Sequence, residues 1–296
     1  MSEERCAILL EEDVPVDPRK YGDLVAPVLK LTKVEARMAV RRGRGLFLED
    51  LPEEDARRIA AALEKDGIRA RVVPRSRMPA LPPPRRVNRL ERGEEALSCR
   101  TEDGTTSVPW EAILVASCGV VARPECGDYF TQVRFQEVPP IHLLEGRERE
   151  IVRENLILRM SAAPRDEAHV KRTVPESIFE EIDQKHSDRV RVCLDLVTLD
   201  LGTWLRVPME EVAYAYAAGG VRMGAAWGFQ LLVADLREKC APAFTELTLK
   251  LFDAADIREL VFPQIEEFTR YTAWVALKRH LGPDAAAPSP GSAPPG

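Results

Sequence analysis

The sequence predicts an α+β protein in which a small N-terminal module precedes a larger domain. Short alternating apolar runs, typical of half-buried strands, are interleaved with segments whose apolar residues recur every three or four positions, as in amphipathic helices. Two proline-rich stretches, 74–84 and 283–296, hold ten of the 23 prolines and punctuate the chain. A length of 296 residues is also sufficient for two domains.

The N-terminal module, residues 1–74, is predicted to have the order β-α-β-α-β, with a short additional helix over 23–30. Thr32 and Glu35 form a capping box at the start of one helix, which Gly43 ends. Pro52 and the acidic residues after it suit the start of the next helix, which Gly67 ends. Strands are expected over 5–13, 45–48 and 68–73.

Three motifs in this module form a pattern. They are Lys33-Val34-Glu35-Ala36-Arg37, then Asp55-Ala56-Arg57-Arg58-Ile59 with Leu63, then Gly67 followed by the alternating run 68–73. In this order they resemble the C-terminal domain of the bacterial ribosomal stalk protein L7/L12 and, more distantly, the protease adaptor ClpS. The stretch 29–32 lacks the glycine that the stalk protein has in its turn. The resemblance implies a compact docking module.

A cluster of basic residues around the first helix is the candidate protein-binding surface. It consists of Lys30, Lys33, Arg37, Arg41, Arg42 and Arg44. One interpretation is that this basic face binds an acidic partner. The alternative is a solvated surface whose charges are balanced by salt bridges.

The segment 75–86 is predicted to be a stiff linker rich in proline and arginine. Its arginines, with those that follow to 92, would suit RNA, phosphate or an acidic partner. No aromatic residue is interleaved with them, and the net charge of the chain is −6, so the sequence argues against nucleic-acid binding. A solvated linker is the favoured interpretation.

The larger domain, 87–281, is expected to contain an antiparallel sheet followed by C-terminal helices. Residues 87–121 have a β-meander pattern, with Asp103-Gly104 as a hairpin turn. The motif Val108-Pro109-Trp110-x-x-Ile113 gives this region a weak resemblance to bacterial pleckstrin-homology-like domains. Residues 123–189 look like a long irregular insertion, and 282–296 like a disordered tail.

A possible ligand site lies near the glycine-rich stretch 219–228, with Asp195, Asp200, Arg206 and Cys118 as candidate members. The stretch lacks the motif of a phosphate-binding loop, and a flexible turn before the helix 229–240 is the favoured interpretation. Asp195 and Asp200, five residues apart, would point to opposite faces of a continuous strand, and Gly202 comes too late in the chain to bring them together by a turn. The favoured interpretation is that each is an acid of a turn or of an edge strand.

The last helix, predicted over 254–281 with a kink at Pro263, carries Phe268 and Tyr271 in its apolar stripe, and Trp274 adds apolar surface beyond that stripe. These three residues are candidates for self-association. The alternative is that the helix packs against the sheet of its own domain.

Together these patterns favour a non-enzymatic, cytoplasmic adaptor or assembly component that docks a protein partner through its N-terminal module. No catalytic, cofactor or metal residues are assigned, because the six cysteines and four histidines show no ligand spacing. No apolar run is long enough to span a membrane, and no signal peptide is visible. The alternatives are a ligand-sensing protein or unfamiliar enzyme, and a ribosome- or RNA-associated factor; homo-oligomerisation stays open.

Overall fold

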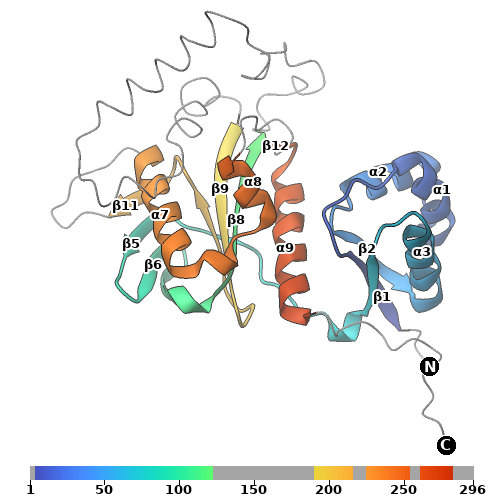
Figure 1. Cartoon of the computed structure of the whole chain (residues 1–296), viewed down its shortest axis with the longest axis horizontal. Helices are drawn as coiled ribbons and strands as arrows, with labels where there is room; N and C mark the ends of the chain where they lie inside the picture. Colours follow the sequence, from blue (N-terminus) through green and yellow to red (C-terminus); the bar gives the residue numbers. More distant parts are fainter. Residues whose placement is uncertain (1–3, 123–189, 216–224, 254–260, 283–296) are drawn as a thin grey trace, which may run out of the picture. The chain divides into compact units, whose positions relative to one another are not determined.

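The computed structural model describes residues 4–122, 190–215, 225–253 and 261–282 (Figure 1). The protein is α+β, as predicted. Contacts between Cα atoms divide it into two compact units. Unit 1 contains residues up to Pro84, the segment Val197–Trp204 and the chain from Glu266 onward; unit 2 contains Arg85–Leu196 and Leu205–Ile265. Each unit is described by itself.

Unit 1 begins with a three-stranded antiparallel sheet and three helices in the order β-α-α-β-α-β. The elements are β1 (Arg5–Leu10), α1 (Pro18–Leu29), α2 (Lys33–Arg42), β2 (Leu46–Pro52), α3 (Glu53–Lys65) and β3 (Ala70–Pro74). The strand order is β2-β1-β3, so β1 is central. Cys6, Ile8 and Leu10 of β1 share one buried core with side chains from all three helices.

The helix ends in this unit follow local rules. The Thr32 hydroxyl accepts a hydrogen bond from the Glu35 amide at 3.3 Å, and Glu35 accepts one from the Thr32 amide at 2.9 Å, so the predicted capping box is confirmed. Helix α1 ends at Lys30, whose backbone is left-handed, with φ 54°. Its amide donates to the Ala26 carbonyl, as a C-terminal glycine usually does.

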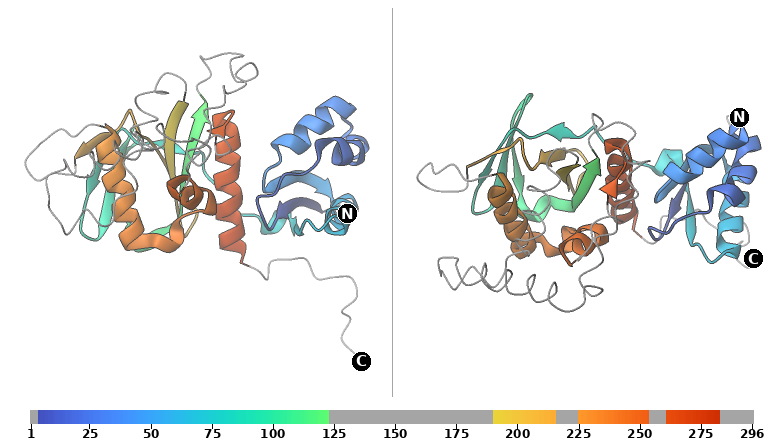
Figure 2. Two further views of the ribbon diagram at one scale, coloured as in Figure 1. Left: turned by 45° about the horizontal axis from the view of Figure 1, so that its top comes forward. Right: turned by 90° about the horizontal axis from the view of Figure 1, so that it is seen from above.

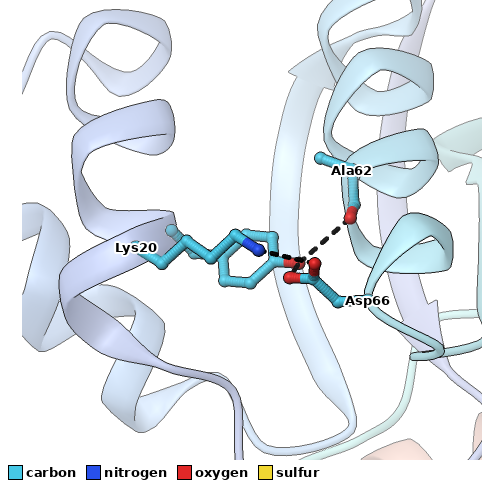
Figure 3. Close-up of polar contacts among 4 residues, drawn as sticks. Lys20, Ala62 and Asp66 are labelled. Atoms are coloured by element: carbon cyan, nitrogen blue, oxygen red, sulfur yellow. Dashed lines mark hydrogen bonds and ion pairs between the residues drawn. The ribbon is translucent and has the colours of Figure 1, made fainter.

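A polar clamp joins α1 to the end of α3 (Figure 3). The Tyr21 hydroxyl donates to the Ala62 carbonyl at 3.1 Å and also contacts the Asp66 carboxylate. Lys20 donates to the other oxygen of Asp66 at 2.5 Å. The hydrogen bond from Lys20, and then that from Tyr21, hold the pKa of Asp66 below its usual range. The clamp fixes α1, the helix on which α2 rests.

Unit 2 contains two mixed sheets. The five-stranded sheet has the order β12-β8-β9-β10-β4, and the four-stranded sheet has the order β11-β5-β6-β7. The strands are β4 (Arg85–Arg86), β5 (Arg89–Arg92), β6 (Ala96–Thr101), β7 (Gly104–Pro109), β8 (Ile113–Ala122), β9 (Val190–Thr198), β10 (Trp204–Pro208), β11 (Ala213–Ala215) and β12 (Val261–Phe262). Antiparallel pairing of β5, β6 and β7 matches the first part of the meander predicted over 87–121, but β8 at its end lies in the other sheet. Parallel pairs extend each sheet: β11 with β5, β10 with β4, and β12 with β8.

Among the described residues of unit 2, the α-helices are α7 (Ala225–Cys240) and α8 (Glu246–Asp253), shown from two further directions in Figure 2. Phe229, Leu232 and Leu236 of α7 join the same apolar core as β8 and β9. Strands β8 and β9 are adjacent in the sheet and buried along nearly their whole length. Both faces of these strands are therefore covered, which is why they lack a polar stripe.

Three predicted elements differ from the structure. The short helix expected over 23–30 is the longer helix α1, which begins at Pro18. Strands β9 and β10 form a hairpin over 190–208 rather than a continuous strand, because Asp200 and Gly202 build a tight turn between them. The last helix, α9 (Ile265–Leu281), begins later than expected, and Val261 and Phe262 before it form β12. Pro263 disfavours helical geometry in the residue before it, which explains the boundary.

Candidate docking site

Helix α2 carries an exposed apolar pair inside a basic surface. Val34 is 66% exposed and Met38 is 47% exposed, although both are large and apolar. Among the described residues only Leu199 and Leu249 are comparably exposed large apolar side chains. Since Val34 and Met38 are four residues apart, they lie on the same side of one helix. This surface is the strongest candidate site of unit 1.

The helix rotates about 100° per residue, so Val34, Met38 and Arg41 fall within an arc of about 60°. Ala36 and Val40 lie on the opposite side and are buried in the core. The exposed stripe is therefore distinct from the side by which α2 packs. We call Val34, Met38, Arg41 and Arg42 the α2 face.

The six predicted basic residues differ in exposure and in ion pairing. Lys30, Lys33, Arg41 and Arg42 are exposed, whereas Arg37 and Arg44 are half-buried. Lys33 and Arg37 approach the same carboxylate oxygen of Asp23 on α1, at 3.8 and 3.4 Å. Lys30, Arg41 and Arg42 have no ion-pair partner in the part of the chain that the structure describes.

Packing of α1 against α2 positions the α2 face. At Gly22 an added Cβ would lie 2.5 Å from Cγ and 3.2 Å from Cα of Arg37, so only glycine allows this close approach. The capping box at Thr32 fixes where α2 begins. The sequence identified the basic residues, but the apolar pair was missed because Val34 and Met38 look like ordinary core positions of an amphipathic helix.

Most arginines of the predicted linker region are paired with carboxylates. Arg75 lies 3.5 Å from Glu49, and Arg92 lies 2.9 Å from Asp235. Arg86 pairs with Glu211, and Arg89 with Glu91. Arg85 and Arg86 also form β4, which pairs with β10. Partial neutralisation reduces the positive charge that this stretch offers to a polyanion.

The structure brings together two of the four predicted ligand-site residues. Both carboxylate oxygens of Asp195, which is fully buried, accept hydrogen bonds from Arg206 at 2.7 Å. Asp200 instead accepts bonds from Thr198 and from the amide of Gly202 in the β9–β10 turn, at 2.6 and 3.0 Å. The Cys118 thiol is fully buried, and desolvation raises its pKa well above its usual range.

The structure describes only 225–228 of the glycine-rich stretch. Residues 219–224 lie outside the described residues. Gly228 is inside α7, where an added Cβ would lie 2.4 Å from Cγ of Tyr214. Packing against the Tyr214 ring therefore explains this glycine. The described ranges contain no group of three or more side chains suited to hold a metal ion.

The three self-association candidates on α9 are buried within the chain. Phe268, Tyr271 and Trp274 have exposed fractions of 0, 2 and 4%. The indole of Trp274 donates to the Leu10 carbonyl at 2.8 Å. Residues 266–282 also group with the first 84 residues rather than with the rest of 87–281.

Comparison of the chain with protein-family models, with curated proteins and with solved structures finds no match. In the part of the chain that the structure describes, no helix combines the length and apolar character that crossing a membrane requires. The function is therefore argued from the geometry of the surface alone.

Proposed function

We propose that this protein is a non-enzymatic docking protein, an adaptor or assembly component, and that the α2 face is its partner-binding surface. The observation that carries the proposal is the exposure of Val34 and Met38 beside two arginines that have no carboxylate partner among the described residues. Exposed apolar side chains with a charged rim are typical of protein-binding sites.

The chemistry of the α2 face selects an acidic, amphipathic helix as the partner. Val34 and Met38 offer apolar contact over about one helical turn, which suits the apolar side chains of a helix. Arg41 and Arg42, in the last turn of α2, attract carboxylates beyond the Met38 end of that contact. Methionine adds adaptability, because its unbranched thioether adjusts to differently shaped partners.

The test uses the full-length protein and two synthetic helical peptides of equal length and apolar content, one rich in glutamate and the other in lysine. Binding is measured by fluorescence polarisation at low and high salt. We expect binding of the acidic peptide only, and weaker binding at high salt because the arginine–carboxylate attraction is screened.

Matched variants locate the surface. Arg41→Glu should weaken binding of the acidic peptide at least tenfold, whereas Arg237→Glu, an exposed arginine in the last turn of α7, should not. Val34→Ser with Met38→Ser should also weaken binding, in contrast to Leu249→Ser on α8. Equal binding of both peptides, or equal losses in test and control variants, would refute the proposal.

A further inference from the structure

The central strand of the small sheet, β1, has buried side chains on both faces of the sheet. The three helices α1, α2 and α3 cover only one of these faces. Cys6, Ile8 and Leu10 pack into the core shared with α1, α2 and α3. Ala7 and Leu9 point to the opposite side, because side chains alternate along a strand, and both are fully buried. Something outside these helices must therefore cover the second face.

Helix α9 contacts one end of this sheet through a row of three donors. Arg270 donates to the Leu46 carbonyl at 2.9 Å, Trp274 to the Leu10 carbonyl at 2.8 Å, and Lys278 to the Glu11 carbonyl. These donors are spaced four residues apart, so they form a line along one side of the helix. Their acceptors all lie where β1 ends and β2 begins.

A glycine makes room for the tryptophan. Gly45 has φ +63°, and an added Cβ would lie 2.1 Å from Cδ2 of Trp274. Both the backbone conformation and the indole therefore exclude any side chain at this position. The Lys278 ammonium lies 5.3 Å from the centre of the Trp274 ring, within range of a cation–π contact.

The sheet also holds the far end of the helix. Arg71 of β3 donates to the carbonyl of Gly282, directly after α9, and pairs with the Glu11 carboxylate. The Arg71 side chain is only 10% exposed. Four polar contacts, and the close approach of Trp274 to Gly45, therefore define the position of α9 on this sheet.

We propose that this sheet end is a second binding site of unit 1, specific for a helix that presents arginine, tryptophan and lysine at four-residue spacing, and that α9 occupies it in cis. The site is distinct from the α2 face, and the proposal does not depend on the proposed function. It makes residues 265–282 a ligand of residues 4–84, and it assigns Trp274 to an intramolecular contact.

The first experiment measures hydrogen exchange in the full-length protein. Trp274→Ala should speed exchange of the Leu10 amide, which donates to the Gly45 carbonyl at 2.7 Å, by at least about tenfold. Gly45→Ala should have the same effect from the opposite side of the contact. Trp274→Phe keeps a ring over Gly45 but loses the donor, so its effect should be smaller.

Trp110→Ala is a closely matched control. Trp110 is 5% exposed, donates to the Gly93 carbonyl at 3.3 Å and has the Lys239 ammonium 5.7 Å from its ring centre, but it lies in unit 2. This variant should leave exchange at Leu10 unchanged. Unchanged exchange at Leu10 in both Trp274→Ala and Gly45→Ala would overturn the proposal.

The second experiment restores the contact in trans. A labelled peptide of residues 265–282 should bind the full-length Trp274→Ala protein and bind the wild type much more weakly, because α9 already fills the site. The same peptide with alanine in place of tryptophan should not bind. Arg41→Glu should not alter peptide binding, which separates this site from the α2 face. Equal binding of both peptides, or of the tryptophan peptide to both proteins, would refute a cis-occupied site.

Discussion

The buried ion pair between Asp195 and Arg206 gives the sharpest test of whether unit 2 carries a polar ligand site. Asp195 is fully buried and the Arg206 side chain is 13% exposed. Two charge-assisted hydrogen bonds of 2.7 Å join them. If the pair only stabilises β9 against β10, apolar residues of similar volume should replace both members without loss of the fold.

The expected losses of stability are large because the two charged groups are buried. Asp195→Asn keeps the shape but removes the charge of the carboxylate that accepts two hydrogen bonds from Arg206, so it should cost about 3–5 kcal/mol of unfolding free energy. Arg206→Met should cost a similar amount, because it removes both donors from the buried Asp195 carboxylate. The double variant Asp195→Leu with Arg206→Met should lie within about 1–2 kcal/mol of the wild type, since no uncompensated charge remains.

Urea denaturation, followed by circular dichroism, measures all four proteins and gives the coupling energy of the cycle directly. Additive losses would refute the reasoning, because independent contributions mean that the two charges do not compensate each other. A double variant that folds would also show that the pair is dispensable for the architecture. A ligand-dependent rise in melting temperature that is lost in this variant would then favour the ligand-site hypothesis.

Four further predictions concern unit 1. Tyr21→Phe should lower the free energy of unfolding by about 1–3 kcal/mol, because it removes the hydroxyl that bonds to the Ala62 carbonyl and the Asp66 carboxylate but keeps the ring. Urea denaturation measures this loss. Lys30→Gly should raise stability by about 0.5–1 kcal/mol in the same assay, because glycine adopts φ 54° without strain. Gly22→Ala should lower the melting temperature and weaken binding of the acidic peptide, whereas a change in neither would show that the helices have room to separate. Folding lowers the pKa of Asp66 from its usual value near 3.8, so the ionised carboxylate stabilises the folded protein when the pH is above 3.8. This contribution should disappear as the pH falls below 3.8 and through the lower pKa of the folded state. Lys20→Met should weaken that pH dependence in urea midpoints measured between pH 6 and pH 2.

Local features of this chain were predictable because they depend on neighbouring residues. The Thr32–Glu35 capping box and the hairpin turn at Asp103-Gly104 each involve a contact within a few residues. An acid of a turn or of an edge strand was the favoured interpretation of Asp200, and the structure places it in the β9–β10 turn. The expectation that Gly202 comes too late in the chain to form that turn was wrong. The signal was present, since aspartate followed two residues later by glycine favours a turn.

Features that depend on distant residues were not predictable from pattern. Trp274 and Leu10 are 264 positions apart, and no sequence pattern in either segment indicates that the two are in contact. Similarly, the pairing of β12 with β8 joins residues that are far apart in sequence. For the candidate docking site, charge located the helix, but only the fold could show that Val34 and Met38 are left outside the core.

The long separation between β1 and α9 has a consequence for synthesis of the protein. Ribosomes add about 5–20 residues per second, so roughly 10–40 seconds pass between completion of the small sheet and completion of its last helix. During that interval the carbonyls of Leu10, Glu11 and Leu46 lack the donors that they have in the finished protein. A nascent chain stalled before residue 265 would therefore present a complete sheet with an uncovered end to chaperones and proteases, and synthesis of α9 would cover that end.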